Sequence, residues 1–143
     1  MTTSFKLYHD SALTQEITAL NPLTATQETS GLLGPVDKTI YFGSTNSANK
    51  IQAVSNPGVD AIVLSIVDSA TGSGSPATEF KLALTSGGLA TATAGAALTL
   101  SATINGGVAN AVPIYTRRAS AIAVAGTYTD LSLNTNSLIE TPI

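Results

Sequence analysis

The stretch VPIYTRRASAIAVAGTYTDLSL, residues 112–133, decides the predicted fold, because it holds two segments of alternating polarity joined by a glycine-containing connection. Alternation with a period of two is the pattern of a β-strand with one buried face. The residues on the buried side of this pattern are Val112, Ile114, Thr116, Tyr128, Leu131 and Leu133. The stretch therefore predicts two late strands with a loop between them.

The connection ends in Gly126-Thr127-Tyr128, where a glycine lets the chain turn and a tyrosine follows at once. In immunoglobulin-like sandwiches, a tyrosine at the corner before a late strand buries its ring and bonds its hydroxyl near the turn. We therefore predict an immunoglobulin-like arrangement in which Tyr128 has that role.

Short alternating segments bounded by Gly, Pro, Asn or Ser recur through the rest of the chain. They predict further strands at residues 5–8, 38–42, 50–54, 60–69, 78–85 and 97–104. Residues 38–54 are expected to form a hairpin, and residues 97–104 the clearest single strand. No segment has the apolar spacing of an amphipathic helix. The predicted fold class is all-β: an antiparallel immunoglobulin-like β-sandwich of about seven or eight strands with an extended N-terminal arm.

The alternation also assigns side chains to faces. Leu82 and Leu84 are expected to point inward, with Glu79 on the more exposed side of the same strand. Leu100 and Leu131 lie on the apolar faces of the two clearest late strands. We therefore expect both of these leucines in the buried layer between the sheets.

Residues 1–37 are the least regular third of the chain, and residues 38–143 are predicted to form the β-sandwich domain. We expect the first part to be an N-terminal arm with the first strand, and a further short strand near residues 12–17. A polar loop this long inside a compact domain is unusual and is often functional. The arm is therefore expected to contact a neighbouring molecule and to be dispensable for folding. An ordinary first strand with a long surface loop is the open alternative.

Charged residues make up 10% of the chain, against about 25% in ordinary soluble domains. A charge-poor surface protects weakly against self-association, so the composition favours a protein that works in an assembly. The net charge of −3 comes with no basic patch, which argues against a nucleic-acid partner. The apolar runs are too short for a membrane span, and residues 1–10 lack the apolar segment of a secretory signal. The chain has no cysteine, which excludes disulfides and thiolate metal sites.

No set of side chains in the sequence predicts catalysis. His9, the single histidine, neighbours Asp10, but adjacent strand residues point to opposite faces and no Gly-x-Ser-x-Gly motif is present. The aspartates lack the spacing of a calcium loop, and the glutamates share no element. The glycine-rich segments lack the Lys-Ser/Thr pair of a phosphate loop. We therefore expect no enzyme activity, no catalytic residue, no cofactor and no metal.

Arg117 and Arg118 form the only basic doublet. On a strand, one guanidinium faces into the protein while the other reaches outward, where a partner carboxylate is a suitable ligand. A solvated pair of strand residues is the alternative. The candidate partner-binding residues come from this doublet, from the arm and from the apolar tail; they are Phe5, Leu7, Tyr8, Leu13, Ile17, Arg117, Arg118, Leu138 and Ile139.

Four phrases together carry a resemblance: FKLYHDSALT at residues 5–14, GPVDK at 34–38 leading to YFGS at 41–44, NPGVD at 56–60 and GTYTDLSL at 126–133. The chain resembles small virion structural proteins of tailed bacteriophages, of the head decoration (cement) type with an immunoglobulin-like β-sandwich. The resemblance implies a non-enzymatic protein that binds and stabilises the outside of the phage capsid. The implied partners are the major capsid protein lattice and further copies of the chain, as in a trimer, and the implied location is the outer surface of the capsid.

Two other functions stay open, a tail or fibre adaptor and a carbohydrate-binding β-sandwich module. A carbohydrate module normally offers an aromatic platform, and this chain has no tryptophan and four tyrosines. The sequence therefore favours the capsid-decoration interpretation.

Overall fold

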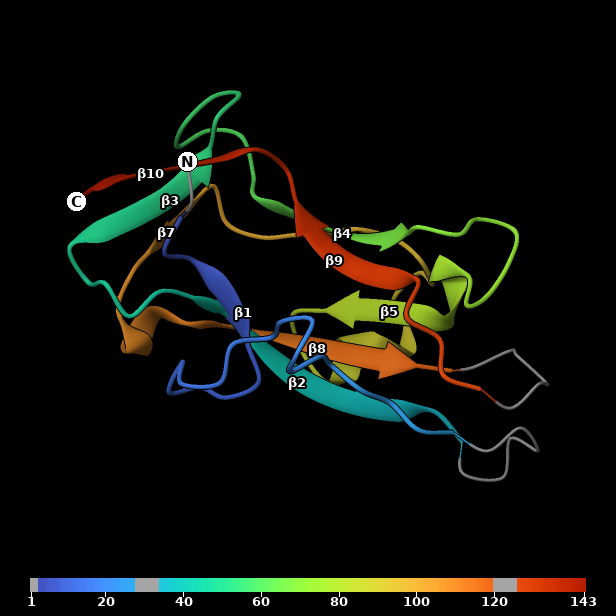
Figure 1. Ribbon diagram of the computed structural model, residues 1–143. Coiled ribbons are helices and arrows are strands. Elements are labelled where there is room, and N and C mark those ends of the chain that lie inside the picture. The colour runs from blue at the N-terminus through green and yellow to red at the C-terminus, as the bar shows by residue number, and fades with distance from the viewer. Residues whose placement is uncertain (1–2, 28–33, 120–125) are drawn as a thin grey trace.

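The computed structural model describes residues 3–27, 34–119 and 126–143 and has the predicted all-β, antiparallel architecture (Figure 1). The strands are β1 (Lys6–Tyr8), β2 (Val36–Gly43), β3 (Asn49–Ala53), β4 (Val63–Asp68), β5 (Phe80–Ala83), β6 (Leu98–Thr99), β7 (Thr103–Asn105), β8 (Val112–Arg118), β9 (Leu131–Thr135) and β10 (Leu138–Pro142). Short 3-10 helices connect some of them, namely η1 (Ala77–Glu79), η2 (Gly87–Ala90) and η3 (Val108–Asn110). The described residues thus form ten strands, against the seven or eight expected.

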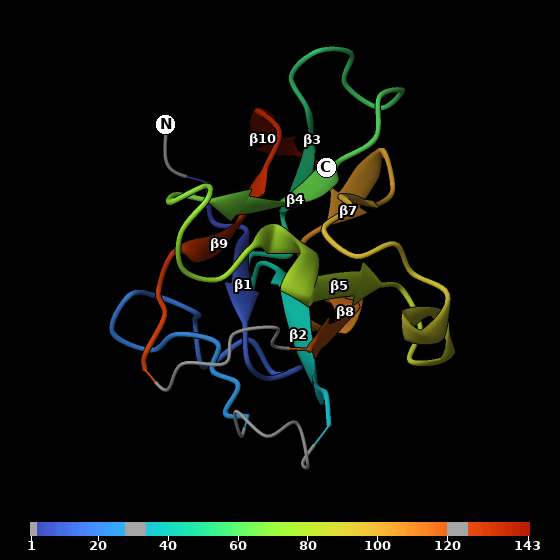
Figure 2. The same ribbon diagram turned by 90° about the vertical axis from the view of Figure 1, so that its right-hand side faces the viewer.

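These strands form three antiparallel sheets, with the orders β1-β2-β8-β5, β10-β3-β7 and β6-β4-β9. In Figures 1 and 2, β4 and β9 lie across from the four-stranded sheet, and β3, β7 and β10 gather at one end of the molecule. The sheets enclose one core, as the layers of a β-sandwich do. Immunoglobulin-like connectivity stays a prediction.

Branched aliphatic side chains fill the space between the sheets. Ile40 of β2 and Ile114 of β8 stand opposite each other, and both are fully buried. Ile51 and Leu64 approach from the other two sheets and are buried as well. Aromatic residues make up only 5% of the chain, so aliphatic side chains supply most of this core.

The stretch that decided the fold prediction forms β8 and β9, but these two strands lie in different sheets. β8 pairs with β2 and β5, and β9 pairs with β4. Part of their connection, residues 120–125, lies outside the described residues. Tyr128 is half-buried, and its ring lies over Gly126, where a Cβ would be 3.6 Å from the ring atoms.

The hairpin expected within residues 38–54 is wrong, although both of its strands exist. β2 pairs with β1 and β8, whereas β3 pairs with β10 and β7. The Gly- and Ser-containing connection between them carries the chain from one sheet into another. Turn-forming residues show that the chain changes direction. They do not show which strand the following segment will pair with.

The single strand expected at residues 97–104 is also wrong, because the structure divides it. β6 pairs with β4, and β7 pairs with β3. Leu100, between the two, is buried and donates its N–H to Ile62 O at 2.7 Å. The predicted apolar face is correct, but the segment crosses from one sheet to the other at its middle.

Three expected side-chain positions are corrected by the structure. Leu84 comes after the end of β5 and is 48% exposed. Glu79 belongs to η1 rather than to a strand, and it is only 3% exposed. Leu131 is half-buried at the start of the edge strand β9, so Leu100 is in the core as expected and Leu131 is not.

Both chain ends pack on the fold. Phe5 is buried, and its ring centroid lies 6.1 Å from that of Phe42. The short strand expected near residues 12–17 does not form; only an isolated bridge joins Glu16 to Tyr8. The apolar tail docks as expected, since β10 pairs along its whole length with β3.

Candidate functional site

A groove of about 470 Å³, open to solvent and lined by both apolar and polar groups, lies between β1 of the four-stranded sheet and β9 of the facing sheet. Its apolar lining belongs to the core or packs against it: Phe5, Leu7, Phe42, Leu64, Leu133 and Leu138. Its polar lining is Thr3, Lys6, Asn134, Thr135 and Ser137. We call it the β1/β9 groove. The sandwich is open along this side, where an apolar side chain from outside can reach core residues.

In the part of the chain that the structure describes, the groove lies beside one uncovered sheet edge, that of β9. β9 pairs on one side only, with β4, within the described residues. The outer edge of β1 is covered by the Tyr8–Glu16 bridge and by a hydrogen bond of 2.8 Å from the Ile17 N–H to Leu7 O. Edge strands carry backbone groups that another chain can bind. The apolar floor is thus flanked by potential hydrogen-bonding groups.

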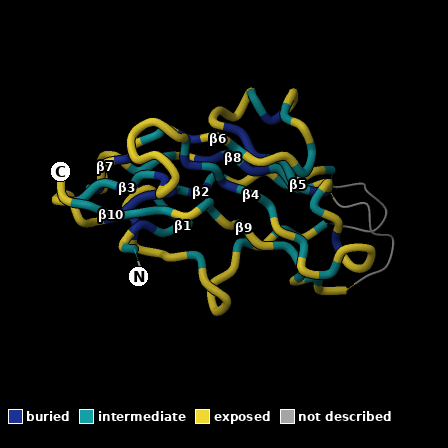
Figure 3. The backbone as a smooth tube through the Cα atoms, turned by 90° about the horizontal axis from the view of Figure 1, so that it is seen from above, coloured by how far each residue is buried: buried dark blue, intermediate teal, exposed yellow. Residues whose placement is uncertain are grey.

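Residues 9–21 form a loop, named here the Leu20 loop, that projects from the side of the molecule on which β1 and β9 lie (Figures 2 and 3). Asp10 organises its first half. Its carboxylate accepts hydrogen bonds from the Thr14 N–H at 3.0 Å, the Thr14 hydroxyl at 2.6 Å and the Gln15 N–H at 2.9 Å. The Thr14 hydroxyl is the main group that lowers the pKa of Asp10.

Leu13 holds this half of the loop against the sheet. It is buried, and it adopts φ = +56°, a left-handed conformation that costs energy for a leucine. Gly43 gives it room, since a Cβ at Gly43 would lie 3.2 Å from Leu13 Cδ1. Burial of the side chain and the bonds to Asp10 compensate for the unfavourable backbone.

The tip of the loop is a closed turn that presents an apolar side chain to solvent. Thr18 and Asn21 exchange backbone hydrogen bonds of 3.2 and 3.1 Å, and Asn21 Nδ2 donates to Glu16 O at 3.0 Å. His9 Nε2 lies 3.0 Å from Asn21 O. Within this turn, Leu20 is 99% exposed. The single histidine therefore takes part in shaping the loop.

Leu20 was missed by the sequence analysis, which treated residues 10–35 as a polar, Thr-rich segment. A usable signal is present, because Asn21-Pro22 is a turn-forming pair directly after an apolar residue. An apolar side chain placed in such a turn lies outside the strands, so it is expected to be exposed.

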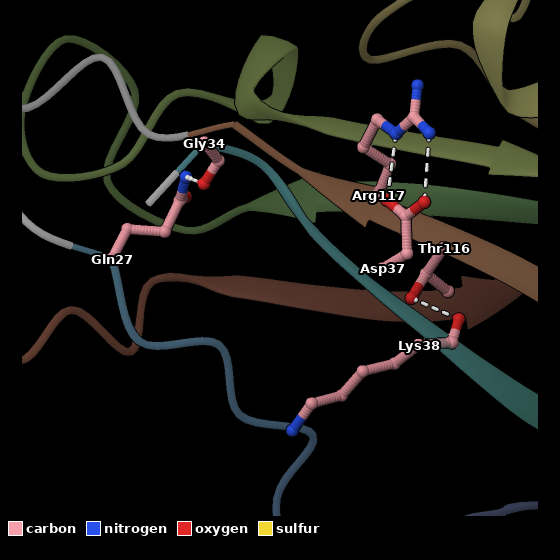
Figure 4. A network of polar contacts seen from close by, with 6 residues as sticks. All are labelled: Gln27, Gly34, Asp37, Lys38, Thr116 and Arg117. Carbon is pink, nitrogen blue, oxygen red and sulfur yellow. Dashed lines mark hydrogen bonds and ion pairs between the residues drawn. The ribbon is translucent and has the colours of Figure 1, made fainter. Parts of the chain in front are cut away.

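The arginine doublet divides as expected, with one side chain facing each way. Arg117 binds Asp37 on the neighbouring strand through two hydrogen bonds of 2.8 Å (Figure 4). The bond from Arg117 is the main group that holds the pKa of Asp37 below its ordinary value. Arg118 turns inward and donates to Glu79 at 3.3 Å and Ser75 at 3.0 Å. Arg118 therefore stabilises its own chain, and Arg117 is half-buried in a surface pair.

The other candidate partner-binding residues lie around the groove and loop. Phe5 and Leu13 are buried, so they support these surfaces from within. Leu7, Ile17 and Leu138 are half-buried against the core. Tyr8 is half-buried; burial, with the charges of Glu16 and Asp10, raises its pKa. Ile139 is half-buried on β10, opposite Gln52 of β3.

A second surface is the outer face of the four-stranded sheet. Because Leu7, Ile40 and Ile114 face the core, their neighbours Tyr8, Tyr41 and Tyr115 point to the opposite face. Tyr8 and Tyr41 stand opposite each other on β1 and β2, and Tyr115 lies one strand further on β8. Half-buried tyrosines thus gather on one face, a grouping that the sequence analysis did not predict.

No group of three or more metal-ligating side chains occurs among residues 3–27, 34–119 and 126–143. In that same part of the chain, no helix has the length and apolar character to cross a membrane. Comparison with protein-family models, curated proteins and solved structures finds no match to this chain.

Proposed function

We propose that this chain is a non-enzymatic virion structural protein that binds and stabilises the outside of a bacteriophage capsid. The observation that carries the proposal is the side of the molecule that combines the β1/β9 groove with the Leu20 loop. That side offers a groove with core leucine and phenylalanine side chains in its lining, and Leu20, which is 99% exposed. Exposed apolar groups and a groove that can accept an anchoring side chain are features of protein-binding surfaces, which a subunit of a capsid lattice requires.

Three further observations support a structural role. The sequence phrases that resemble phage decoration proteins include FKLYHDSALT, whose residues build β1 and the first part of the Leu20 loop. The single histidine contacts a backbone oxygen of that loop. A surface with few charges also suits a protein that spends its working life in contact with others.

Co-sedimentation with phage heads assembled without this chain tests the proposal. The purified protein is expected to bind heads at a fixed, saturable ratio and to raise the temperature at which they release DNA. Heads of an unrelated phage serve as the control. Absence of saturable binding would contradict the proposal, and density for the chain on the tail or fibres in a particle map would favour the adaptor alternative.

The tyrosine face supports a second candidate, a carbohydrate-binding module. Tyr8, Tyr41 and Tyr115 offer ring faces to sugar CH groups, and Asp37, Lys81 and Arg117 occupy one row across the same face. Glycan-array binding that is lost in Tyr41→Ala and Tyr115→Ala, with the fold retained, would support this function. Retention of head binding by the same variants would separate it from the first.

A further inference from the structure

We propose that the β1/β9 groove accepts the Leu20 loop of a second copy of this chain, and that the two copies do so reciprocally in a two-fold dimer. The inference concerns self-association. A dimer of this kind covers the surface that carries the proposed function, so capsid binding through that surface requires the dimer to dissociate. It assigns an occupant to the groove and a partner to the most exposed large apolar side chain of the described residues.

The Leu20 loop has the properties of an inserting element. Leu20 is 99% exposed, yet the turn that carries it is closed by the paired Thr18 and Asn21 hydrogen bonds and anchored by Asn21 to Glu16. An ordered loop loses little conformational entropy when it binds. Solvation of an apolar side chain held this far out is unfavourable until a partner covers it.

The groove has the matching properties of a receptor. Its floor consists of leucine and phenylalanine side chains, and its rim carries the half-buried or exposed polar residues Asn134, Thr135 and Ser137. A central apolar anchor with a polar rim is the arrangement found at interfaces whose binding energy is concentrated in a few residues. At about 470 Å³, the groove has space for a leucine side chain.

Charge complementarity points to the same pairing. The Leu20 loop carries Asp10 and Glu16 and no lysine or arginine. Lys6 is the charged residue of the groove lining, and the ion pairs found within the described part of the chain involve neither Lys6 nor Glu16. Attraction between Glu16 of one copy and Lys6 of the other fixes the orientation of the loop in the groove.

The position of the two features determines the symmetry. Figures 2 and 3 show the loop after β1 projecting on the side where β1 and β9 lie. When a projection and its receptor share one side of a molecule, two copies can face each other and exchange both contacts. Such an interface is isologous and closes at two subunits.

Sedimentation equilibrium of the full chain, over a wide range of concentrations, is the first test. Wild-type protein is expected to show a monomer–dimer equilibrium. Leu20→Asp is expected to raise the dissociation constant by at least about tenfold, because each dimer loses two apolar anchors. Val59→Asp is the matched control, because Val59 is 70% exposed on a loop that does not line the groove. Circular dichroism melting confirms that each variant is folded.

Cross-linking provides a second test, and the absence of native cysteines makes it specific. Leu20→Cys protein is mixed with mass-tagged Asn134→Cys protein under mild oxidation. The mixed disulfide dimer is expected to form several-fold faster than with Val59→Cys in place of Leu20→Cys. Asn134 is exposed on the groove rim, so the substitution leaves the core intact.

A wild-type chain that stays monomeric at every concentration would overturn the inference. The same holds if Leu20→Asp leaves dimerisation unchanged, or if the mixed disulfide forms no faster than in the control. A trimer as the limiting species would exclude the two-fold arrangement. All of these measurements are made without phage heads, so they test self-association separately from head binding.

Discussion

At the scale of single residues, Gly106 packs so closely against neighbouring backbone that a side chain does not fit there. Gly106 follows β7, and its N–H donates to Asn49 O at 2.8 Å. A Cβ at this position would lie 2.0 Å from Asn46 O, so the backbone of the β2–β3 connection lies directly against it. The connection that carries the chain from β2 to β3 therefore requires a glycine at position 106, far from Asn46 in the sequence.

We expect Gly106→Ala to lower the free energy of unfolding by about 2 kcal/mol or more, because the backbone of Asn46 must move. Gly87→Ala is the matched control, since a Cβ at Gly87 would have no heavy atom within 4 Å. Urea denaturation of the two variants measures the difference. Equal stability of the two would show that the β2–β3 connection can shift freely.

The pair formed by Arg118 and Glu79 gives a second prediction at this scale. The Glu79 side chain is 1% exposed and that of Arg118 is 18% exposed. Glu79→Ala removes one partner of a buried pair and should cost about 3 kcal/mol, whereas Glu16→Ala on the surface should cost less than about 0.5 kcal/mol. Chemical denaturation at neutral pH measures both, and a neutral outcome for Glu79→Ala would mean that water reaches Arg118.

At the scale of elements, the location of strands could be predicted from the sequence, but their pairing could not. Alternation of side chains is a local property, so β2, β3, β4 and β8 were found close to their actual positions. Pairing depends on residues far apart, as in β2 with β8, and no local signal distinguishes a hairpin turn from a sheet crossing. The same division between local and long-range information applies to the candidate site. The opposite orientations of Arg117 and Arg118 could be predicted from local strand geometry. The β1/β9 groove could not be predicted, because residues from all three sheets line it.

The corrected position of Leu131 yields a testable difference between two leucines. Leu100 is buried, so Leu100→Ala should cost about 2–5 kcal/mol. Leu131 is half-buried on an edge strand, and Leu131→Ala should cost less than about 1.5 kcal/mol. Denaturant melts of the two variants test this order, and a reversed order would place β9 in a different register on β4.

β1 leads to a prediction about truncation. Phe5 is buried against Phe42, and β1 pairs with β2 along its three residues. Removal of residues 1–35 should therefore abolish cooperative thermal melting, because it exposes the floor of the core. Removal of residues 1–2 is the control. A truncated chain that still melts cooperatively would instead support the expectation that the arm is dispensable for folding.

At the scale of the whole molecule, Glu140 joins the two ends of the chain. Its carboxylate accepts hydrogen bonds from the Ser4 N–H at 2.7 Å, the Ser4 hydroxyl at 2.6 Å and Asn49 Nδ2 at 2.8 Å. Burial raises the pKa of Glu140, but these hydrogen bonds outweigh it and hold the pKa below its ordinary value of 4.5. The ionised carboxylate thus links β10, β3 and the segment before β1.

The sign of the pH effect follows from that lowered pKa. The carboxylate stabilises the fold above about pH 4.5, and this stabilisation is lost as the pH falls through the lower pKa of the folded state. Glu140→Ala should lower the free energy of unfolding by about 1 kcal/mol at neutral pH and less at acid pH. Denaturation of both proteins between neutral and acid pH checks the convergence, and a constant difference would contradict it.

The bond between Ser4 and Glu140 also brings the first and last elements of the fold to the same end of the molecule (Figure 1). A short peptide linker could therefore join the existing ends, and new ends could be opened within the exposed connection at residues 71–74. Such a circular permutant would keep every sheet pairing and move the attachment point of a fused peptide away from β3 and β10. The fold thus offers two separate attachment points for a fused peptide, one at the existing chain ends and one at residues 71–74.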